Sequence, residues 1–290
     1  MKYTYYPGCS LKGTGRAYEE SLLAVFHALE VELEELDDWN CCGATTYMSY
    51  DEVQSYALAA RNLSLAKKTG RDLMAPCAAC YLGLHKTQNY VRDYPWIGHI
   101  VEHALTAIGY STDLSVRIRH PLDILLNDVG LPAIKAKVVH SLNGLEVATY
   151  YGCQLVRPYA LFDNQREPTS MDRLLAACGA TIVDYPLKTQ CCAGSQKGTL
   201  PEVGLDRIQR LLAGALRVGA ETIATVCPLC QFNLEAFQEQ ASNAHQFDLP
   251  VLYFTQLLAV AFGIPLKQAG LQRSFVSIEP VLAHREIAYV

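Results

Sequence analysis

The sequence predicts an α/β fold made of two pseudo-symmetric, duplicated α/β units with parallel-rich sheets. Two observations lead to this prediction: cysteines recur in the same order in both halves, and strand-like segments alternate with helical ones in each half. The chain has 290 residues and half of them are hydrophobic. It is therefore long enough and apolar enough for two domains of ordinary size, each with a buried core.

The duplication is visible in ten of the eleven cysteines. Each copy has an isolated cysteine, an adjacent pair and a C-x-x-C motif: Cys9, Cys41, Cys42, Cys77 and Cys80 in the first, and Cys153, Cys191, Cys192, Cys227 and Cys230 in the second. In both copies 34 residues separate the adjacent pair from the C-x-x-C motif. The interval before the pair is 31 residues in the first copy and 37 in the second, so the second copy is longer there by six.

Segments with strand character stand before the isolated cysteines and before the C-x-x-C motifs: residues 3–6, 72–75, 146–151 and 222–226. Amphipathic helices are expected between them, for example from the apolar face of Leu22, Val25, Phe26 and Leu29. A C-x-x-C motif between a strand and a helix places its sulfurs near a helix N-terminus. The positive end of the helix dipole there favours thiolates.

We expect three regions: a first cysteine-rich repeat at 1–110, a structured connector at 111–146, and a second repeat with a C-terminal tail at 147–290. In each copy a proline, Pro95 or Pro250, opens a mostly apolar segment that ends at a glycine, so these two segments are expected to correspond. The connector has short helical patterns at 122–129 and 133–139. It also lacks the Gly/Ser composition of a flexible linker.

Composition excludes several classes of protein. The formal net charge of −5 provides no basic field for nucleic acid. The longest apolar stretch, residues 251–264, is interrupted by two polar residues and is too short to span a bilayer, and the first residues lack the apolar core of a signal peptide. We therefore expect a cytoplasmic protein with no transmembrane segment. In a reducing compartment an odd number of cysteines indicates a role other than disulfide bonding.

The two sets of five cysteines point to metal chemistry. A zinc site has four protein ligands and an ordinary [4Fe–4S] cubane has four thiolates, whereas each half offers five. Either one sulfur in each half is a spare, or the cluster is larger or more open than a cubane. Gly43, or Ala193 with Gly194, follows each adjacent pair and permits a bend that turns both sulfurs toward one centre. Two structural zinc sites, or thioredoxin-like C-x-x-C chemistry, leave part of each set unexplained.

The repeated order of Cys, Cys-Cys-Gly and C-x-x-C resembles the cysteine-rich CCG domain family, most closely the B subunit of heterodisulfide reductase and its bacterial relatives. This resemblance implies two non-cubane [4Fe–4S] clusters, each held by the five cysteines of one set, with one sulfur bridging two irons. The ligands so implied are Cys9, Cys41, Cys42, Cys77, Cys80, Cys153, Cys191, Cys192, Cys227 and Cys230. The sequence departs from the family pattern at Ala193, which stands where the glycine follows the cysteine pair.

The resemblance implies a catalytic iron–sulfur subunit that reduces, or reversibly forms, a disulfide at clusters facing a shared cavity. The substrate would be the coenzyme M–coenzyme B heterodisulfide, or a carrier-bound disulfide or persulfide. No ferredoxin-type cysteine run is present, so electrons are expected from another polypeptide. The resemblance implies two partners in the same complex, the ferredoxin-like [4Fe–4S] C subunit and the flavin-containing A subunit. The alternative it implies is an electron-transfer subunit of a quinone-linked dehydrogenase of the succinate, glycolate or lactate type.

Other reactive residues receive simpler interpretations. Cys178 is expected to be an ordinary buried helix residue, because free cysteine is among the most buried residue types. Arg157 and Lys197 follow proposed ligands and are candidates to meet an anionic substrate. The histidines show no paired metal-binding spacing, and no catalytic residue is expected beyond the cluster ligands.

Overall fold

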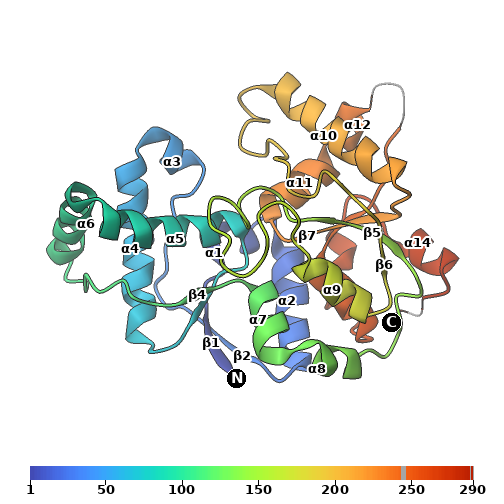
Figure 1. Ribbon diagram of the computed structural model, residues 1–290, viewed down its shortest axis with the longest axis horizontal. Coiled ribbons are helices and arrows are strands. Elements are labelled where there is room, and N and C mark those ends of the chain that lie inside the picture. Colours follow the sequence, from blue (N-terminus) through green and yellow to red (C-terminus); the bar gives the residue numbers. More distant parts are fainter. Residues whose placement is uncertain (243–245, 288, 290) are drawn as a thin grey trace. The chain divides into compact units, whose positions relative to one another are not determined.

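The computed structural model describes residues 1–242, 246–287 and 289, and these residues form two compact units (Figure 1). The first unit consists of Met1–Lys12 and Val31–Pro121, and the second of Gly13–Glu30 and Leu122–Val290. Each contains one four-stranded sheet in which every strand pair is parallel. The predicted pair of duplicated α/β units with parallel sheets is therefore confirmed.

The sheet of the first unit has the strand order β2–β1–β3–β4. Its strands are β1 (Lys2–Tyr5), β2 (Glu32–Glu35), β3 (Leu73–Met74) and β4 (Ile118–Arg119). The helices of this unit are α1 (Gly8–Leu11), α3 (Thr46–Tyr50), α4 (Glu52–Lys68), α5 (Ala78–Asp93) and α6 (Pro95–Ala107). Helix α4 packs against α5 and α6. It begins after Asp51, whose carboxylate accepts hydrogen bonds of 3.0 Å from the backbone N–H groups of Val53 and Gln54.

The sheet of the second unit repeats this order as β6–β5–β7–β8. Its strands are β5 (Glu146–Tyr150), β6 (Thr181–Ile182), β7 (Thr222–Thr225) and β8 (Val251–Tyr253). Its helices are α2 (Arg16–Ala28), η1 (Leu125–Val129), α8 (Leu131–Ala136), α9 (Ser170–Ala177), α10 (Pro201–Arg217), α11 (Pro228–Ala236), α12 (Gln238–Ala241), α13 (Phe254–Ala261), η2 (Leu271–Arg273) and α14 (Glu279–His284). A short helix α7 (Pro121–Ile124) spans the sequence boundary between the units. Helix α13 is buried along its whole length and packs on β7 and β8, which explains the long apolar stretch of the sequence.

Helix α2 lies in the sequence of the first repeat but packs in the second unit, against α13. The hydroxyl oxygens of Ser21 and Thr255 are 2.6 Å apart, and both residues are fully buried. The ring of Tyr18 stacks on that of Tyr253, with centroids 4.5 Å apart and an interplanar angle of 6°. The sequence correctly predicted this helix, but periodicity carries no information about the unit in which its apolar face is buried.

The fourth strand of the first sheet, β4, lies at 118–119, within the segment expected to be a connector. Strand β4 pairs with β3 as β8 pairs with β7, so β4 is the structural counterpart of β8. The expected correspondence between the segments that follow Pro95 and Pro250 is therefore wrong, because Pro95 begins helix α6 whereas Pro250 precedes a strand. A two-residue strand is too short to show the alternation by which strands are recognised. The helical patterns expected between 122 and 139 are confirmed by α7, η1 and α8.

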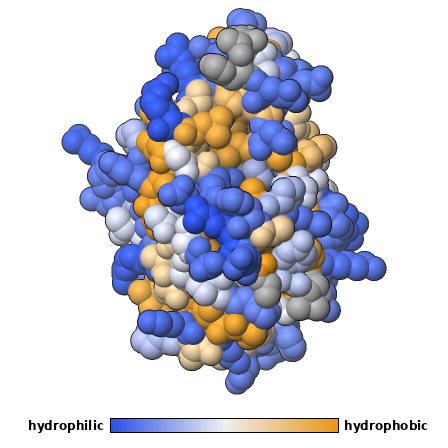
Figure 2. All heavy atoms as spheres, turned by 90° about the vertical axis from the view of Figure 1, so that its right-hand side faces the viewer, coloured by the Kyte–Doolittle hydropathy of each residue, from blue (hydrophilic) through white to orange (hydrophobic). Residues whose placement is uncertain are grey.

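Among the described residues, no helix combines the length and the apolar character needed to cross a bilayer. The face that carries α14 has hydrophilic side chains over much of its area, with smaller groups of apolar side chains between them (Figure 2). Such a mixture is ordinary for a folded chain, because polar atoms alone do not cover a protein surface.

Candidate metal centres

The cysteines follow the carboxyl ends of three strands in each sheet. In the first unit, Cys9 follows β1, the pair Cys41–Cys42 follows β2, and Cys77 follows β3. Strands β5, β6 and β7 stand in the same relation to the second set. Because parallel strands end at the same edge of a sheet, each unit brings its five cysteines to one edge.

The five thiols of the first unit form one connected group. The Sγ atom of Cys41 lies 3.9 Å from that of Cys9, and the Sγ atom of Cys42 lies 3.2 Å from that of Cys80. Cys41 and Cys42 are hydrogen-bonded to each other, and so are Cys77 and Cys80. Cys9 is exposed, Cys41 is half-buried and the other three are buried, so the group opens to solvent at Cys9.

The buried thiols of this group perturb one another strongly. Hydrogen bonds from Cys41 and Cys80 hold the pKa of Cys42 well below the usual value for a thiol. The pKa of Cys80 is raised, first by its hydrogen bond to Cys42, then by that to Cys77 and by burial. One thiolate is thus stabilised while ionisation of its neighbour is opposed. All five can ionise together only when a positively charged centre compensates them.

The second unit gathers its five thiols into two hydrogen-bonded groups, and the charges of Cys192 and Cys227 act on Cys153. The Sγ atoms of Cys192 and Cys230 are 3.4 Å apart, and Cys230 is also hydrogen-bonded to Cys227. Cys153 and Cys191 are hydrogen-bonded to each other. Cys191 is exposed and Cys153 half-buried, while the other three thiols are buried. The solvent-exposed position is therefore a different one from that of the first unit.

Cys191 is a surface thiol whose ionisation is favoured by its surroundings. Its pKa is lowered to about 6, mainly by the hydrogen bond from Cys153. The backbone N–H of Ala193 donates to its sulfur over 3.3 Å, and the guanidinium groups of Arg207 and Arg157 lower the pKa further. The sulfur of Cys191 thus lies in a locally positive environment at the surface.

Each C-x-x-C motif stands between a strand and a helix, as the sequence predicts. Cys77 occupies the N-cap position of α5 and Cys227 that of α11, and both have extended backbone angles. The second cysteine of each motif therefore lies in the first helical turn. There the free backbone N–H groups and the helix dipole favour the thiolate form.

The glycine before each isolated cysteine lies directly against the C-x-x-C motif. Gly8 and Gly152 both have a φ of +67°. A Cβ atom at Gly8 would lie 2.9 Å from the Sγ of Cys80, and one at Gly152 would lie 3.2 Å from the Sγ of Cys230. Only glycine combines this backbone conformation with such close approach to a sulfur.

A buried tyrosine fixes the segment before each adjacent pair. The hydroxyl of Tyr6 donates to the carbonyl oxygen of Asn40 over 2.8 Å, and that of Tyr150 donates to the carbonyl oxygen of Gln190 over 2.6 Å. Both tyrosine side chains are fully buried. The tyrosines stand at matching places, three residues before the isolated cysteine, and the accepting residues directly precede Cys41 and Cys191. This role was not predicted from the sequence, although the repeated Tyr is its signal.

The bend after each adjacent pair differs between the copies. Gly43 adopts a φ of +76°, and Ala193 adopts a φ of +57° at the corresponding position. The structure thus keeps the left-handed bend where the sequence departs from the family pattern. The cost falls on the backbone of Ala193, because a Cβ atom disfavours this conformation.

The donor set of each centre fits an iron–sulfur cluster. Five sulfurs at the edge of one sheet are soft ligands of the kind that iron–sulfur clusters use. The close approach of Gly8 and Gly152 to sulfur and the mutual perturbation of the thiols fit a group held through several thiolates. Within residues 1–242, 246–287 and 289, no three cysteine, histidine or carboxylate side chains surround a point closely enough to hold one metal ion.

Cys178, the eleventh cysteine, is a separate case. It caps the C-terminus of α9 and is 1% exposed, as expected for an ordinary core residue. Burial raises its pKa to about 12, and no other thiol contributes to that shift.

Of the two cations expected to meet an anionic substrate, only Arg157 lies beside a centre. Arg157 and Cys191 line the same pocket, together with Arg207 of α10. The ammonium group of Lys197 instead lies 4.2 Å from the ring centroid of Phe237. Arg207 was not predicted from the sequence, because it stands 15 residues beyond Cys192 and only the path of α10 brings it back to the pocket.

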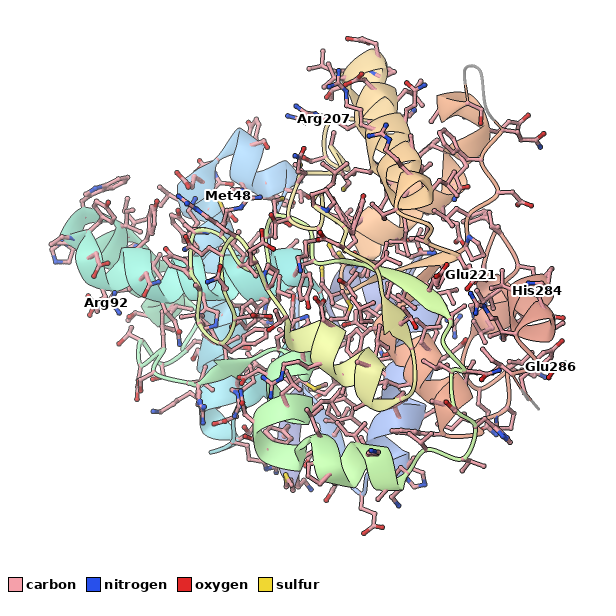
Figure 3. The ribbon with its side chains drawn as sticks, turned by 45° about the vertical axis from the view of Figure 1, so that its right-hand side comes forward. Met48, Arg92, Arg207, Glu221, His284 and Glu286 are labelled. Carbon is pink, nitrogen blue, oxygen red and sulfur yellow. The ribbon has the colours of Figure 1, made fainter. Side chains whose placement is uncertain are left out.

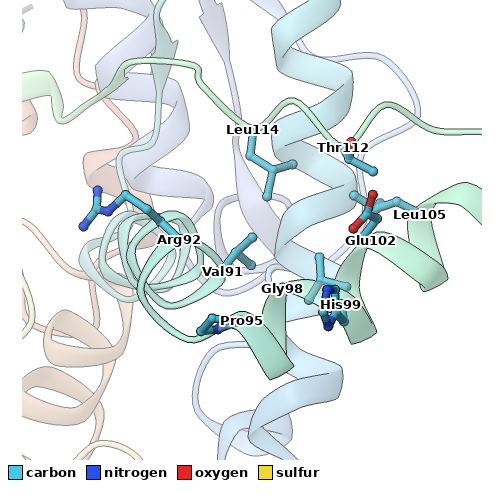
Figure 4. Close-up of a pocket in the computed structure, with 10 residues that line it drawn as sticks. Val91, Arg92, Pro95, Gly98, His99, Glu102, Leu105, Thr112 and Leu114 are labelled. Atoms are coloured by element: carbon cyan, nitrogen blue, oxygen red, sulfur yellow. The ribbon is translucent and has the colours of Figure 1, made fainter.

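A separate pocket on the first unit is unrelated to the thiols. It has a volume of about 350 Å³ and is lined by residues of α5, α6 and the segment at 112–114, including Val91, His99 and Glu102 (Figure 4). No cysteine lines it. This pocket therefore lies outside the two thiol groups.

Comparison with known proteins places this arrangement in a family. The chain is 31% identical over 281 residues to a heterodisulfide reductase B-subunit-like protein of Archaeoglobus profundus, covering 93% of this chain and 94% of the relative. It is 27% identical to the 8-methylmenaquinol:fumarate reductase membrane anchor subunit of Wolinella succinogenes, covering 95% and 97%.

A crystal structure of a hypothetical protein from Helicobacter pylori has the same fold, with a TM-score of 0.74 and 14% identity. The match covers 95% of this chain and 52% of that chain, so this chain spans about half the length of the solved structure. The cysteine-rich domain family CCG matches residues 3–85 and 147–235, which include all ten clustered cysteines. The chain therefore belongs to the cysteine-rich CCG domain family and carries two copies of its domain.

Proposed function

We propose that this chain is the catalytic iron–sulfur subunit of a heterodisulfide-reductase-type complex, which reduces or reversibly forms a disulfide. The observation that carries the proposal is the gathering of five thiols at one sheet edge in each unit. The similarity to a heterodisulfide reductase B-subunit-like protein over nearly the whole chain supports it.

The proposed cofactors are two non-cubane [4Fe–4S] clusters. The ligands of the first are Cys9, Cys41, Cys42, Cys77 and Cys80, and those of the second are Cys153, Cys191, Cys192, Cys227 and Cys230. Five thiols at one sheet edge exceed the four that a cubane uses, which supports a more open cluster over a cubane with a spare cysteine. When bound, two such clusters supply one electron each, and cleavage of a disulfide to two thiols takes two electrons and two protons.

The residues of the chain prepare each centre for this chemistry. Helix N-termini at Cys77 and Cys227 stabilise negative charge on sulfur, and glycine at positions 8 and 152 leaves room beside the buried thiols. The exposed thiols, Cys9 in one unit and Cys191 in the other, mark the side from which a substrate reaches each centre. The buried thiols keep the opposite side of each centre away from water.

The proposed partners are a ferredoxin-like [4Fe–4S] protein, the C subunit of such a complex, which delivers electrons, and a flavoprotein, its A subunit. The names of the relatives describe subunits, which supports a multisubunit complex. The substrate class is a small thiol–disulfide couple or a carrier-bound disulfide.

A second candidate is an electron-transfer subunit of a quinone-linked dehydrogenase. It is favoured by the similarity to the membrane anchor subunit of a menaquinol:fumarate reductase over 95% of the chain. In that case the same two clusters pass electrons onward, and no disulfide is cleaved.

Anaerobic purification tests the proposal. We expect about eight irons per chain, from two clusters of four irons, and reduction of disulfides by chemically reduced protein in single turnover. Zinc in place of iron would overturn the cluster assignment. Full iron content without any disulfide cleavage, combined with rapid electron exchange with a quinol-linked partner complex, would favour the second candidate.

A further inference from the structure

A pocket beside the second centre is lined by arginine. Its volume is about 700 Å³, and Arg157, Arg166 and Arg207 line it together with Cys191. An adjoining hollow of about 350 Å³ shares Cys191 and Arg207 and adds Arg210 and Arg217. The exposed thiol of the second centre therefore lies at the junction of two hollows that carry five guanidinium groups.

The positive charge at this pocket is largely uncompensated. Glu167 is the one carboxylate among the described residues that line it, and the carboxylate lies 3.9 Å from the ammonium of Lys188. Arg210 in the adjoining hollow is paired with Asp206 at 2.8 Å. No described carboxylate lies within ion-pair distance of Arg207, on the side of α10 facing the loop after Cys191 (Figure 3). On a chain of net charge −5, such a local excess of cations needs a ligand to explain it.

One arginine of the pocket is held in place by the fold. The guanidinium of Arg157 donates a hydrogen bond to the carbonyl oxygen of Thr189, two residues before Cys191. Arg207 comes from α10 and lines the same pocket. Both guanidinium groups lie near enough to the thiol of Cys191 to lower its pKa. Two guanidinium groups from different segments beside one sulfur suit an oxyanion joined to a sulfur-containing group.

The first copy differs from the second at the positions of two of these arginines. The equal spacing of the two copies makes Ala57 the counterpart of Arg207 and Gly13 the counterpart of Arg157. Arg166 lies in the interval where the second copy is longer by six residues. Near the first pair, Asp37 and Asp38 are exposed, and Asp38 forms an ion pair with Arg61. Arg207 and Arg157 therefore have no cationic residue at the corresponding positions of the first copy.

We propose that this pocket binds the oxyanion group (carboxylate, sulfonate or phosphate) of a small disulfide or thiol, and so fixes its anionic end at the second centre. The inference rests on the proposed function and names the specificity of the same site. A hollow of this volume matches small-molecule sites, whereas a partner protein needs a far larger surface. The pocket thereby decides which sulfur of an asymmetric substrate meets the second centre.

Three disulfides of similar size and different charge test the proposal: dithiodiglycolate is dianionic, bis(2-hydroxyethyl) disulfide is neutral and cystamine is dicationic. Their binding to the full-length, anaerobically purified protein is measured by calorimetry at low and high salt. We expect dithiodiglycolate to bind at least about tenfold tighter than the neutral disulfide, with an advantage that falls at high salt, because exposed ionic contacts are screened. Cystamine is expected to bind most weakly.

The variants Arg207→Gln and Arg157→Gln test whether these two arginines bind the anionic disulfide. Each is expected to weaken dithiodiglycolate binding by about tenfold, the usual value of one charge-assisted contact, and to shrink its advantage over the neutral disulfide. Arg92→Gln is the matched control: it removes an exposed arginine of the first unit that is paired with Asp93 (Figure 3). It is expected to leave both affinities within about twofold, in line with other exposed surface substitutions.

The outcomes separate the pocket from the proposed function. Equal binding of all three disulfides, or unchanged affinity in both arginine variants, overturns the pocket even when the protein carries iron and cleaves disulfides. Arginine-dependent binding of an acidic carrier protein with none of the small disulfides also overturns it. Conversely, if the protein carries no iron–sulfur clusters, calorimetry of disulfide binding to the iron-free protein still tests the pocket.

Discussion

The two halves of the molecule have the same kinds of residue packed against their cysteine sulfurs. They differ in the exposed surroundings of those sulfurs. Both have a glycine against the C-x-x-C motif, a buried tyrosine that holds the adjacent pair, and a helix that begins at the motif. They differ in the exposed thiol, which is Cys9 in one and Cys191 in the other, and in the charge beside it.

The difference separates two kinds of requirement. Positions packed against the thiols leave little choice of residue, because a Cβ or a lost hydrogen bond there displaces a sulfur. Positions facing outward from the same loops are free to diverge, and there the second half has Arg157 and Arg207 where the first has Gly13 and Ala57. A duplicated site can thus keep one chemistry at two centres while the surroundings assign each centre a different role.

The largest expected effect comes from removing one thiol of an adjacent pair. Cys42→Ala is expected to halve the iron content from about eight to about four per chain, because the first cluster is lost while the second is retained. Cys192→Ala is expected to do the reverse, and Cys41→Ala and Cys191→Ala should each damage the cluster of their own half. Iron analysis and low-temperature EPR distinguish the two centres.

Cys178→Ala is the matched control, since it removes a buried thiol that belongs to neither group. It is expected to keep full iron content and to cost only about 1 kcal/mol of packing. Unchanged iron and EPR signals after either substitution in the first pair would show that this half holds a cubane with a spare cysteine.

Exchanging glycine and alanine in the bends after the two cysteine pairs is expected to change stability by different amounts in the two units. Gly43→Ala is expected to destabilise the first unit by about 2–4 kcal/mol, from the left-handed backbone and from a Cβ only 2.8 Å from the Oγ of Ser55. Ala193→Gly is expected to change stability by less than about 1 kcal/mol, because relief of backbone strain is offset by a more flexible unfolded chain. Thermal melts of both variants measure the asymmetry, and equal effects would contradict it.

His85 and Glu235 occupy matching places, eight residues after the first cysteine of each C-x-x-C motif. They are expected to make the stability of the two units respond to pH in opposite directions. Burial raises the pKa of Glu235 to about 7 and lowers that of His85 to about 4. Stability due to Glu235 is complete below about pH 4.5 and is lost as pH rises through 7, a loss of roughly 3 kcal/mol. Stability due to His85 is complete above about pH 6.5 and is lost as pH falls through 4.

Hydrogen exchange of α5 and α11 between pH 4 and 8, corrected for intrinsic rates, measures the two responses separately. Glu235→Gln is expected to flatten the profile of α11 and leave that of α5 unchanged, and His85→Gln is expected to do the opposite. Parallel profiles in the two helices would refute the assignment.

The smallest expected effect concerns what the halves share. Tyr6→Phe and Tyr150→Phe each remove a buried hydrogen bond to a carbonyl oxygen and are expected to cost about 1–2 kcal/mol, with faster loss of iron to a chelator. The exposed Tyr50 provides the control Tyr50→Phe, with a change within about 0.5 kcal/mol. A clearly larger effect in one half would show that the tyrosines are not equivalent.

Much of the fold and of the candidate centres could be predicted from the sequence, because both follow from local order along the chain. A strand leads through Cys77 into a helix, and the same pattern recurs at Cys227. This pattern predicts a parallel sheet with thiols at the edge where its strands end. The repeat also indicated which cysteine stands apart, and Cys178 is indeed a core residue.

The remainder depends on packing between distant segments. Arg207 meets Cys191 only through the direction in which α10 crosses the loop, which no spacing encodes. Strand β4 has two residues, too few for a pattern, and it is defined by its pairing with β3. Lys197 has the same charge as Arg157 and follows a cysteine at a similar separation in the sequence. Its side chain nevertheless packs on Phe237, which the sequence does not indicate.

The position of α2 has a consequence for synthesis of the protein. Ser21 and its partner Thr255 are 234 residues apart, so this helix leaves the ribosome long before its binding surface on α13 exists. At an elongation rate of about 5–20 residues per second the delay is on the order of tens of seconds. Through that time the apolar face with Leu22, Val25 and Phe26, fully buried in the finished protein, stays without its native cover. A truncated protein that ends between the two repeats would leave this face of α2 without its native cover permanently. During synthesis, we expect chaperones to bind the nascent first repeat.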